Sequence, residues 1–144
     1  MTESTEVHEG GCLCGAVRYR ITGPVRGVVN CHCGQCVRTH GLYAAYSNAA
    51  SADMDLTGAD AISWYQSSAQ ARRGFCGTCG SQLFWERTGS ETISVAAGTF
   101  DQPSGIKTVG HIYMADKPDF YEIDDDLPKF PGTSDGDLDG EQSL

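Results

Sequence analysis

The chain contains no long apolar segment. No run among its 144 residues approaches the roughly 18 consecutive apolar residues that a membrane-spanning helix needs. The first ten residues, MTESTEVHEG, also lack the apolar stretch of a secretory signal peptide. We therefore expect neither membrane insertion nor secretion, and we predict a cytoplasmic protein without a membrane partner.

Positive charge is scarce. Ten lysines and arginines stand against 19 aspartates and glutamates, which gives a formal net charge of −9. The segment from Glu122 to the C-terminus contains eight of the acids and one base, Lys129. Proteins that bind the phosphate backbone of nucleic acids need a basic surface. The charge distribution therefore argues against nucleic acid as a partner.

Long stretches with helical periodicity are missing as well. Between Ala16 and Ile21, apolar residues alternate with arginines, a pattern typical of a half-buried strand. Similar short strands are expected over residues 28–31, 42–46, 62–65, 82–86, 92–97 and 111–115. Turns rich in glycine and proline separate them, so the sequence predicts a mainly β fold.

These strands are expected to form one domain over residues 1–130, with a polar and frayed start over residues 1–10. Residues 67–73 are compatible with a short helix or a loop. From residue 131 onward, PGTSDGDLDGEQSL has no aliphatic cluster. Such a composition cannot bury enough apolar surface to order itself, so we expect an acidic, disordered tail over residues 131–144.

The seven cysteines all lie in three tight clusters. An odd number, in a chain without an export signal, argues against a closed disulfide framework. The clusters are Cys12 with Cys14, then Cys31 with Cys33 and Cys36, and finally Cys76 with Cys79. Cysteines that only filled a core would not group in this way, so the pattern indicates metal ligands.

The spacing of the cysteines suits tetrahedral zinc, which thiolates bind at about 2.3 Å. Cysteines two apart on a strand share a face, and a Cys-x-x-Cys turn curls around the ion. Seven ligands divide naturally into four and three. The first and third clusters would form a closed structural site, whereas Cys31, Cys33 and Cys36 would leave one zinc position open. An open position is typical of a catalytic zinc.

Three other interpretations of the cysteines remain open at this point. A redox Cys-x-x-Cys normally opens a helix after a strand in a βαβ unit, a setting that neither motif has. His32 or His40 could close the second site as a structural centre of three cysteines and one histidine. An iron–sulfur cluster fits the ligand type but not ferredoxin-like spacing.

At these residues the chain resembles the glutathione-dependent formaldehyde-activating enzyme family, whose zinc-binding domain also occurs in centromere protein V. The matching segments are GGCLCGAVRY at residues 10–19, CHCGQC at 31–36 with Gly41, RGFCGTCGSQL at 73–83, and HIY at 111–113. The resemblance spans roughly residues 8–130 and brings all seven cysteines into register. The basic segments of centromere protein V have no counterpart here, since this chain has an acidic tail.

The resemblance implies a compact set of coiled antiparallel β-sheets, called a β-tent, organised around two zinc ions. It also implies a carbon–sulfur lyase that condenses glutathione with formaldehyde to S-(hydroxymethyl)glutathione. In that family Cys12, Cys14, Cys76 and Cys79 correspond to the structural site, and Cys31, Cys33 and Cys36 to the catalytic site. The alternative is a non-catalytic carrier of zinc or glutathione. A purely structural interaction module would have no open zinc position.

The proposed chemistry requires a reactive thiolate and a proton for the product oxygen. A free thiol, with a pKa of about 8.5, is mostly protonated at pH 7, whereas a zinc-bound thiol is deprotonated. Candidates that assist proton transfer are His40, His111 and Tyr43. Arg38 and Arg73 are candidates for binding the glutathione carboxylates. We expect His32 to point away from the metal, and Trp64, Phe84 and Trp85 to belong to the core.

Overall fold

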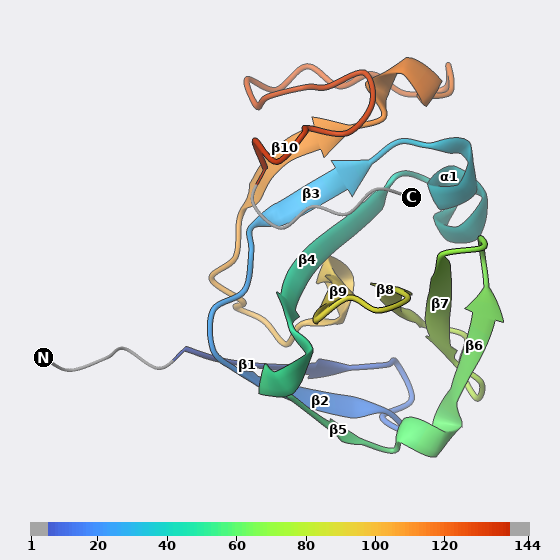
Figure 1. The fold of residues 1–144 in the computed structure, drawn as a ribbon, viewed down its shortest axis with the longest axis vertical. Helices are drawn as coiled ribbons and strands as arrows, with labels where there is room; N and C mark the ends of the chain where they lie inside the picture. Colours follow the sequence, from blue (N-terminus) through green and yellow to red (C-terminus); the bar gives the residue numbers. More distant parts are fainter. Residues whose placement is uncertain (1–5, 139–144) are drawn as a thin grey trace, which may run out of the picture.

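The computed structural model describes residues 6–138, and two β-sheets make up most of it (Figure 1). The smaller sheet contains the antiparallel strands β1 (Val7–Gly11), β2 (Arg18–Thr22) and β5 (Met54–Thr57) in that order. The larger sheet contains β3 (Val28–Cys31), β4 (Ala44–Ala50), β6 (Ile62–Gln66), β7 (Ala71–Cys76), β8 (Gln82–Arg87), β9 (Thr92–Ala96) and β10 (Thr108–Ile112). Its order is β10-β3-β4-β9-β8-β7-β6, in which β10 runs parallel to β3 and the other pairs are antiparallel.

Helical structure is short. Helix α1 (Gly34–His40) follows β3 directly and ends at Gly41, whose φ of 85° is the left-handed conformation that glycine adopts without strain. Single 3₁₀ turns cover η1 (Ser51–Asp53), η2 (Ala59–Ala61), η3 (Ala97–Thr99) and η4 (Met114–Asp116). Among residues 6–138, no helix has the length and apolar character of a membrane span.

The seven-stranded sheet curls strongly. In Figure 1, strands β10, β3 and β4 form one wall and strands β7 and β6 the other, with the three-stranded sheet across the lower end. Helix α1 lies at the open upper end, where the Gln35 amide donates a hydrogen bond to the Ser67 carbonyl at 3.0 Å. The curl thereby brings the end of β3 opposite β7, although the two strands lie far apart in the order of the sheet.

Two apolar clusters fill the interior. The first lies between the sheets, where the Tyr19 ring meets the rings of Phe84 and Phe100 edge-on at 5.8 and 5.7 Å. The second lies inside the curl and contains Trp85, Tyr46 and the cysteines of the second cluster. This second apolar cluster therefore contains both core residues and the cysteines Cys31, Cys33 and Cys36 that are predicted to bind metal.

The predicted mainly β fold is confirmed, with differences at particular elements. Residues 7–10 were expected to be frayed, but they belong to β1, whose backbone pairs with β2 from Val7 to Gly11. Residues 71–76 form β7, so the last three residues of the stretch predicted as a short helix or a loop belong to the sheet, and residues 67–70 form the loop before it. The last strand begins at Thr108 rather than at residue 111, and follows β3 as its parallel partner.

The segment predicted to be a disordered tail also differs where it is described. Leu138 is 7% exposed and its side chain lies over Gly110, where an added Cβ would be 2.8 Å from Leu138 Cδ1. Ser134 is buried and its hydroxyl accepts a hydrogen bond from the Leu138 N–H at 3.0 Å. One leucine thus anchors residues 131–138, and residues 139–144 lie outside the described part of the chain.

Candidate metal centres and the adjoining cavity

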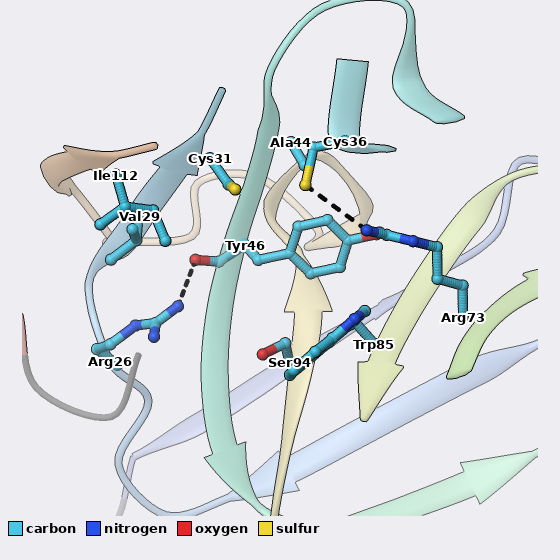
Figure 2. A pocket seen from close by; sticks show the side chains of 10 residues that line it. All are labelled: Arg26, Val29, Cys31, Cys36, Ala44, Tyr46, Arg73, Trp85, Ser94 and Ile112. Atoms are coloured by element: carbon cyan, nitrogen blue, oxygen red, sulfur yellow. Dashed lines mark hydrogen bonds between the residues drawn. The ribbon is translucent and has the colours of Figure 1, made fainter. Parts of the chain in front are cut away.

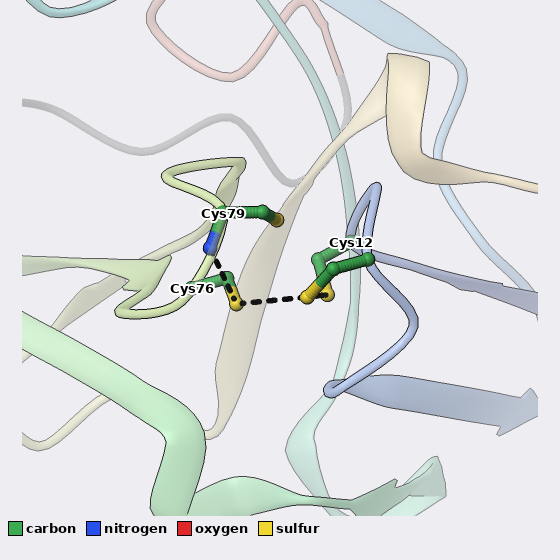
Figure 3. A group of neighbouring side chains, drawn as sticks. Cys12, Cys76 and Cys79 are labelled. Carbon is green, nitrogen blue, oxygen red and sulfur yellow. Dashed lines mark hydrogen bonds between the residues drawn. The ribbon is translucent and has the colours of Figure 1, made fainter.

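The first and third cysteine clusters meet in space. Cys12 and Cys14, from the loop between β1 and β2, lie against Cys76 at the end of β7 and Cys79 in the following turn. Figure 3 shows Cys12, Cys76 and Cys79 of this group. The four sulfurs lie within 4.8 Å of one another, and the Cys14 and Cys76 sulfurs are 3.8 Å apart. This is the closed four-thiol set expected for a structural metal.

Backbone N–H groups point at these sulfurs. Those of Thr78 and Cys79 donate to Cys76 Sγ at 3.4 and 3.5 Å, and that of Val17 donates to Cys12 Sγ at 3.3 Å. The Ser81 hydroxyl lies 3.2 Å from Cys79 Sγ, and hydrogen bonding from it lowers the pKa of Cys79 to about 5. Donors aimed at sulfur favour the thiolate, which is the form that binds zinc.

The second cluster forms a set of three. The sulfurs of Cys31, at the end of β3, and of Cys33 and Cys36, at the start of α1, lie within 4.8 Å of one another. All three residues are buried. Hydrogen bonds from the Cys31 and Cys36 thiols lower the pKa of Cys33 to about 3, and the same cluster raises the pKa of Cys31. Hydrogen bonding within the set therefore favours a thiolate at Cys33.

Arg73 places a positive charge beside this set. It is 2% exposed, and its guanidinium donates to Gln35 Oε1 at 2.7 Å and to Cys36 Sγ at 3.6 Å. Within residues 6–138, no carboxylate lies within ion-pair distance of it. A buried cation needs a compensating negative charge, and thiolates are the group available. Three thiolates, one Zn²⁺ and Arg73 would together be neutral, so the residues present fit a zinc ion.

Both histidines near the three cysteines are engaged elsewhere. His32 Nδ1 lies 2.6 Å from the Tyr121 hydroxyl and its Nε2 lies 2.9 Å from His111 Nδ1, so its ring points away from the sulfurs as expected. His40 Nε2 lies 2.8 Å from the Tyr46 hydroxyl, and its Nδ1 lies 3.0 Å from the Cys36 carbonyl oxygen. Neither histidine closes the three-sulfur set.

The buried His32 and His111 belong to a hydrogen-bonded chain that ends at the exposed Asp125. His111 Nε2 lies 2.8 Å from Asp125 Oδ2. A carboxylate only accepts, so His111 Nε2–H donates to Asp125. With both imidazoles neutral, His32 Nε2–H then donates to His111 Nδ1, and the Tyr121 hydroxyl donates to His32 Nδ1. Burial lowers the pKa of His32 to about 4, and the bond from His111 lowers that of Asp125 to about 2. This chain ties residues 121–125 to the ends of β3 and β10.

A partly open cavity of about 50 Å³ adjoins the three-cysteine site (Figure 2). Cys31 and Cys36 line it from one side, and Trp85 and Ser94 from β8 and β9 line it from the other. The remaining lining residues are Arg26, Val29, Ala44, Tyr46, Arg73 and Ile112. A small molecule in this cavity would lie directly beside two of the three sulfurs.

The structure brings some predicted site residues to this cavity and separates others from it. Arg73 lines the cavity, and His40 reaches it through the Tyr46 hydroxyl. Tyr43 precedes Ala44 in the chain and points to the opposite face, where it lines a separate groove. The His111 side chain faces His32 and Asp125. Arg38 is exposed on α1.

Three residues beside the site were not predicted from the sequence. Gln35 orients Arg73, Tyr46 connects His40 to the cavity, and Trp85 forms part of the wall rather than core alone. Tyr46 could have been found from the sequence, because it lies two positions after Ala44 in an expected strand and residues two apart on a strand share a face. Both line the cavity. Gln35 lies within the CHCGQC motif, but nothing in the sequence identifies its contact with Arg73, 38 positions away.

A curled, mainly β fold with one closed four-thiol set and one open three-thiol set defines a protein that could bind two metal ions. A comparison with known families matches residues 7–116 to the family described as glutathione-dependent formaldehyde-activating enzyme. The chain belongs to this family.

Individual proteins are similar to this chain over much of its length. A Halomonas elongata protein, provisionally named as a glutathione-dependent formaldehyde-activating enzyme, is 33% identical over 128 residues, covering 81% of this chain and 80% of its own. An uncharacterised lyase of Schizosaccharomyces pombe is 27% identical over 118 residues, covering 81% and 85%. The crystal structure of a Rhodobacter sphaeroides protein, 28% identical, matches with a TM-score of 0.54 over 65% of this chain and 88% of that one.

Proposed function

We propose that this protein is a zinc-dependent carbon–sulfur lyase that condenses glutathione, or a similar small thiol, with formaldehyde or a related small aldehyde. The product with glutathione and formaldehyde is S-(hydroxymethyl)glutathione. The observation that carries the proposal is the set of three buried cysteine sulfurs beside a small cavity, with no fourth metal-binding side chain among residues 6–138. Membership of the family supports the choice of substrates.

The reaction joins sulfur to the aldehyde carbon. The S–H bond and the π bond of the carbonyl break, an S–C bond forms, and the proton finishes on the former carbonyl oxygen. A zinc ion held by Cys31, Cys33 and Cys36 would lower the pKa of a thiol bound to it, and so supply the nucleophile. No oxidant or reductant is required.

Residues of this chain would provide the surrounding charge and hydrogen bonds. Arg73 donates to Cys36 Sγ, so its positive charge would offset the negative charge added when the substrate thiolate binds beside the three cysteine thiolates. The Tyr46 hydroxyl, held by His40, is our candidate for passing a proton to the product oxygen. Arg38, exposed on α1, is the candidate for a glutathione carboxylate. His111 and Tyr43 stay candidates from the sequence, but their side chains are directed away from the cavity.

The test is the exchange rate between glutathione and formaldehyde, followed by NMR exchange spectroscopy with sub-stoichiometric zinc-loaded protein. Acceleration by the wild type and not by Cys36→Ser would support catalysis at the three-cysteine site. Equal exchange rates with the wild type and with Cys36→Ser, measured when both samples contain the same amount of bound glutathione, would contradict the proposed enzyme and favour the carrier. Arg20→Ala, which changes an exposed side chain of β2, is the matched control.

A further inference from the structure

Trp85 contributes an unused hydrogen-bond donor beside the cavity. The residue lies on β8 between Arg73 of β7 and Ser94 of β9, and is 4% exposed. Its Nε1 atom is buried and has no hydrogen-bond partner among residues 6–138. In Figure 2 the indole nitrogen lies at the end of the ring nearer to Tyr46 and Arg73. Buried donors are nearly always paired, so an unpaired one beside a cavity indicates a ligand atom.

The other polar groups around the cavity are already engaged. Arg26 donates to the carbonyl oxygens of Gly27 and Tyr46, at 3.0 and 2.8 Å, and Arg73 donates to Gln35 and Cys36. The Ser94 hydroxyl accepts from the Asn48 amide at 3.1 Å. Indole N–H only donates. The group that pairs with Trp85 must therefore offer an acceptor, such as a carbonyl or hydroxyl oxygen.

The volume of the cavity limits what can enter. A water molecule needs roughly 10–15 Å³ of such space, so about 50 Å³ corresponds to three to five water-sized groups. The reacting end of S-(hydroxymethyl)glutathione, from the cysteinyl carbon through sulfur and carbon to oxygen, has this size, but the whole tripeptide does not. Val29, Ala44 and Ile112 make much of the wall apolar, which suits a carbon chain with one polar end.

From this arrangement we infer that Trp85 binds the oxygen of the adduct, and that the cavity accepts the thiol end together with a one- or two-carbon aldehyde. The inference rests on the proposed function and specifies its substrate class. Sulfur would lie beside Cys31 and Cys36, and oxygen would accept from Trp85 Nε1–H on the opposite wall. Aldehydes with longer carbon chains would exceed the cavity, because the thiol end and the first carbons already fill its volume of about 50 Å³.

Two small thiols test this assignment without depending on recognition of glutathione. 2-Mercaptoethanol and 1-propanethiol each have four non-hydrogen atoms, and they differ in ending with a hydroxyl or a methyl group. Each is titrated into zinc-loaded protein while the indole N–H signals are followed by NMR. The sequence has two tryptophans, so Trp64→Phe and Trp85→Phe assign both signals, and Trp64 serves as the internal control.

We expect 2-mercaptoethanol to shift the Trp85 indole proton downfield, and 1-propanethiol to leave it without a hydrogen bond. Trp85→Phe should reduce the preference for 2-mercaptoethanol, measured as the ratio of the two Kd values, by about three- to tenfold. Zinc content, measured by mass spectrometry, should stay unchanged. The shift in the wild type tests the inference even if the variant does not fold.

Other outcomes overturn the assignment. A Kd ratio that stays within twofold of the wild-type value, or an indole signal that does not move while signals of α1 respond, means that another group binds the oxygen. Failure of both thiols to bind shows that the cavity is not a thiol site. If the probes behave as expected but glutathione–formaldehyde exchange is not accelerated, the proposed function fails and the role of Trp85 in binding oxygen stands.

Discussion

Cys76→Ser tests whether the four-cysteine site holds distant parts of the fold together. Cys14 and Cys76 are 62 positions apart, and a metal that links them closes this whole length of chain. The chain-entropy relation for a cross-link gives about 4 kcal/mol for a loop of about 60 residues. We therefore expect Cys76→Ser to lower the free energy of unfolding by about 4 kcal/mol, a large share of the total for a domain of this size.

Cys36→Ser is the matched comparison, since it also removes one buried sulfur ligand. The three-cysteine set spans only about six residues, for which the same relation gives about 2 kcal/mol. Each variant should lose one zinc of two. At roughly 2–4 °C per kcal/mol, we expect the melting temperature to fall by about 8–16 °C for Cys76→Ser and by about 4–8 °C for Cys36→Ser.

The assay combines thermal unfolding, followed by circular dichroism, with zinc content measured on the same samples. The reasoning requires both the loss of one zinc and the larger destabilisation in Cys76→Ser. Equal shifts in melting temperature, with one zinc lost in each variant, would refute it, because the length of the closed loop would then not determine the stabilisation. Retention of two zinc ions by either variant would refute the division into four and three ligands.

Four other substitutions test further assignments. His111→Leu leaves the His32 N–H without an acceptor, so it should lower the free energy of unfolding in urea by about 1–3 kcal/mol without slowing glutathione–formaldehyde exchange. Asp125→Asn changes an exposed carboxylate and should lower it by less. A loss of exchange activity in folded His111→Leu would show that His111 acts in the reaction. Leu138→Ala should cost about 2 kcal/mol because Leu138 covers Gly110, and an unchanged urea midpoint would support a disordered tail. Arg38→Ala should raise the KM for glutathione without changing zinc content; an unchanged KM would remove this residue from the binding site.

The sequence was most informative where its signal was local. The strands over residues 28–31, 62–66, 82–87 and 92–96 were expected within a residue or two. The two sets of cysteines were also predicted, because the chemistry of tetrahedral thiolate sites restricts how seven ligands can be divided.

The rest depends on contacts between segments far apart in the chain. Strand β1 has no clear apolar alternation, and it is ordered by pairing with β2. His40 reaches the cavity only through Tyr46, and Arg73 faces Cys36 only because the sheet curls around. The burial of Leu138 could not be predicted from composition, because a single leucine hardly changes the average hydropathy of an acidic segment.

The site fixes the length and register of strand β3. Val29 and Cys31 line the cavity, whereas Val28 and Asn30 line the groove on the other side of the sheet. Deleting or inserting one residue in this strand would exchange the two sets and turn Cys31 away from its partners. Diversification of substrate choice within such a fold is therefore expected to proceed by substitutions on the facing walls, at positions such as Ala44 or Ile112, while the length of β3 stays fixed.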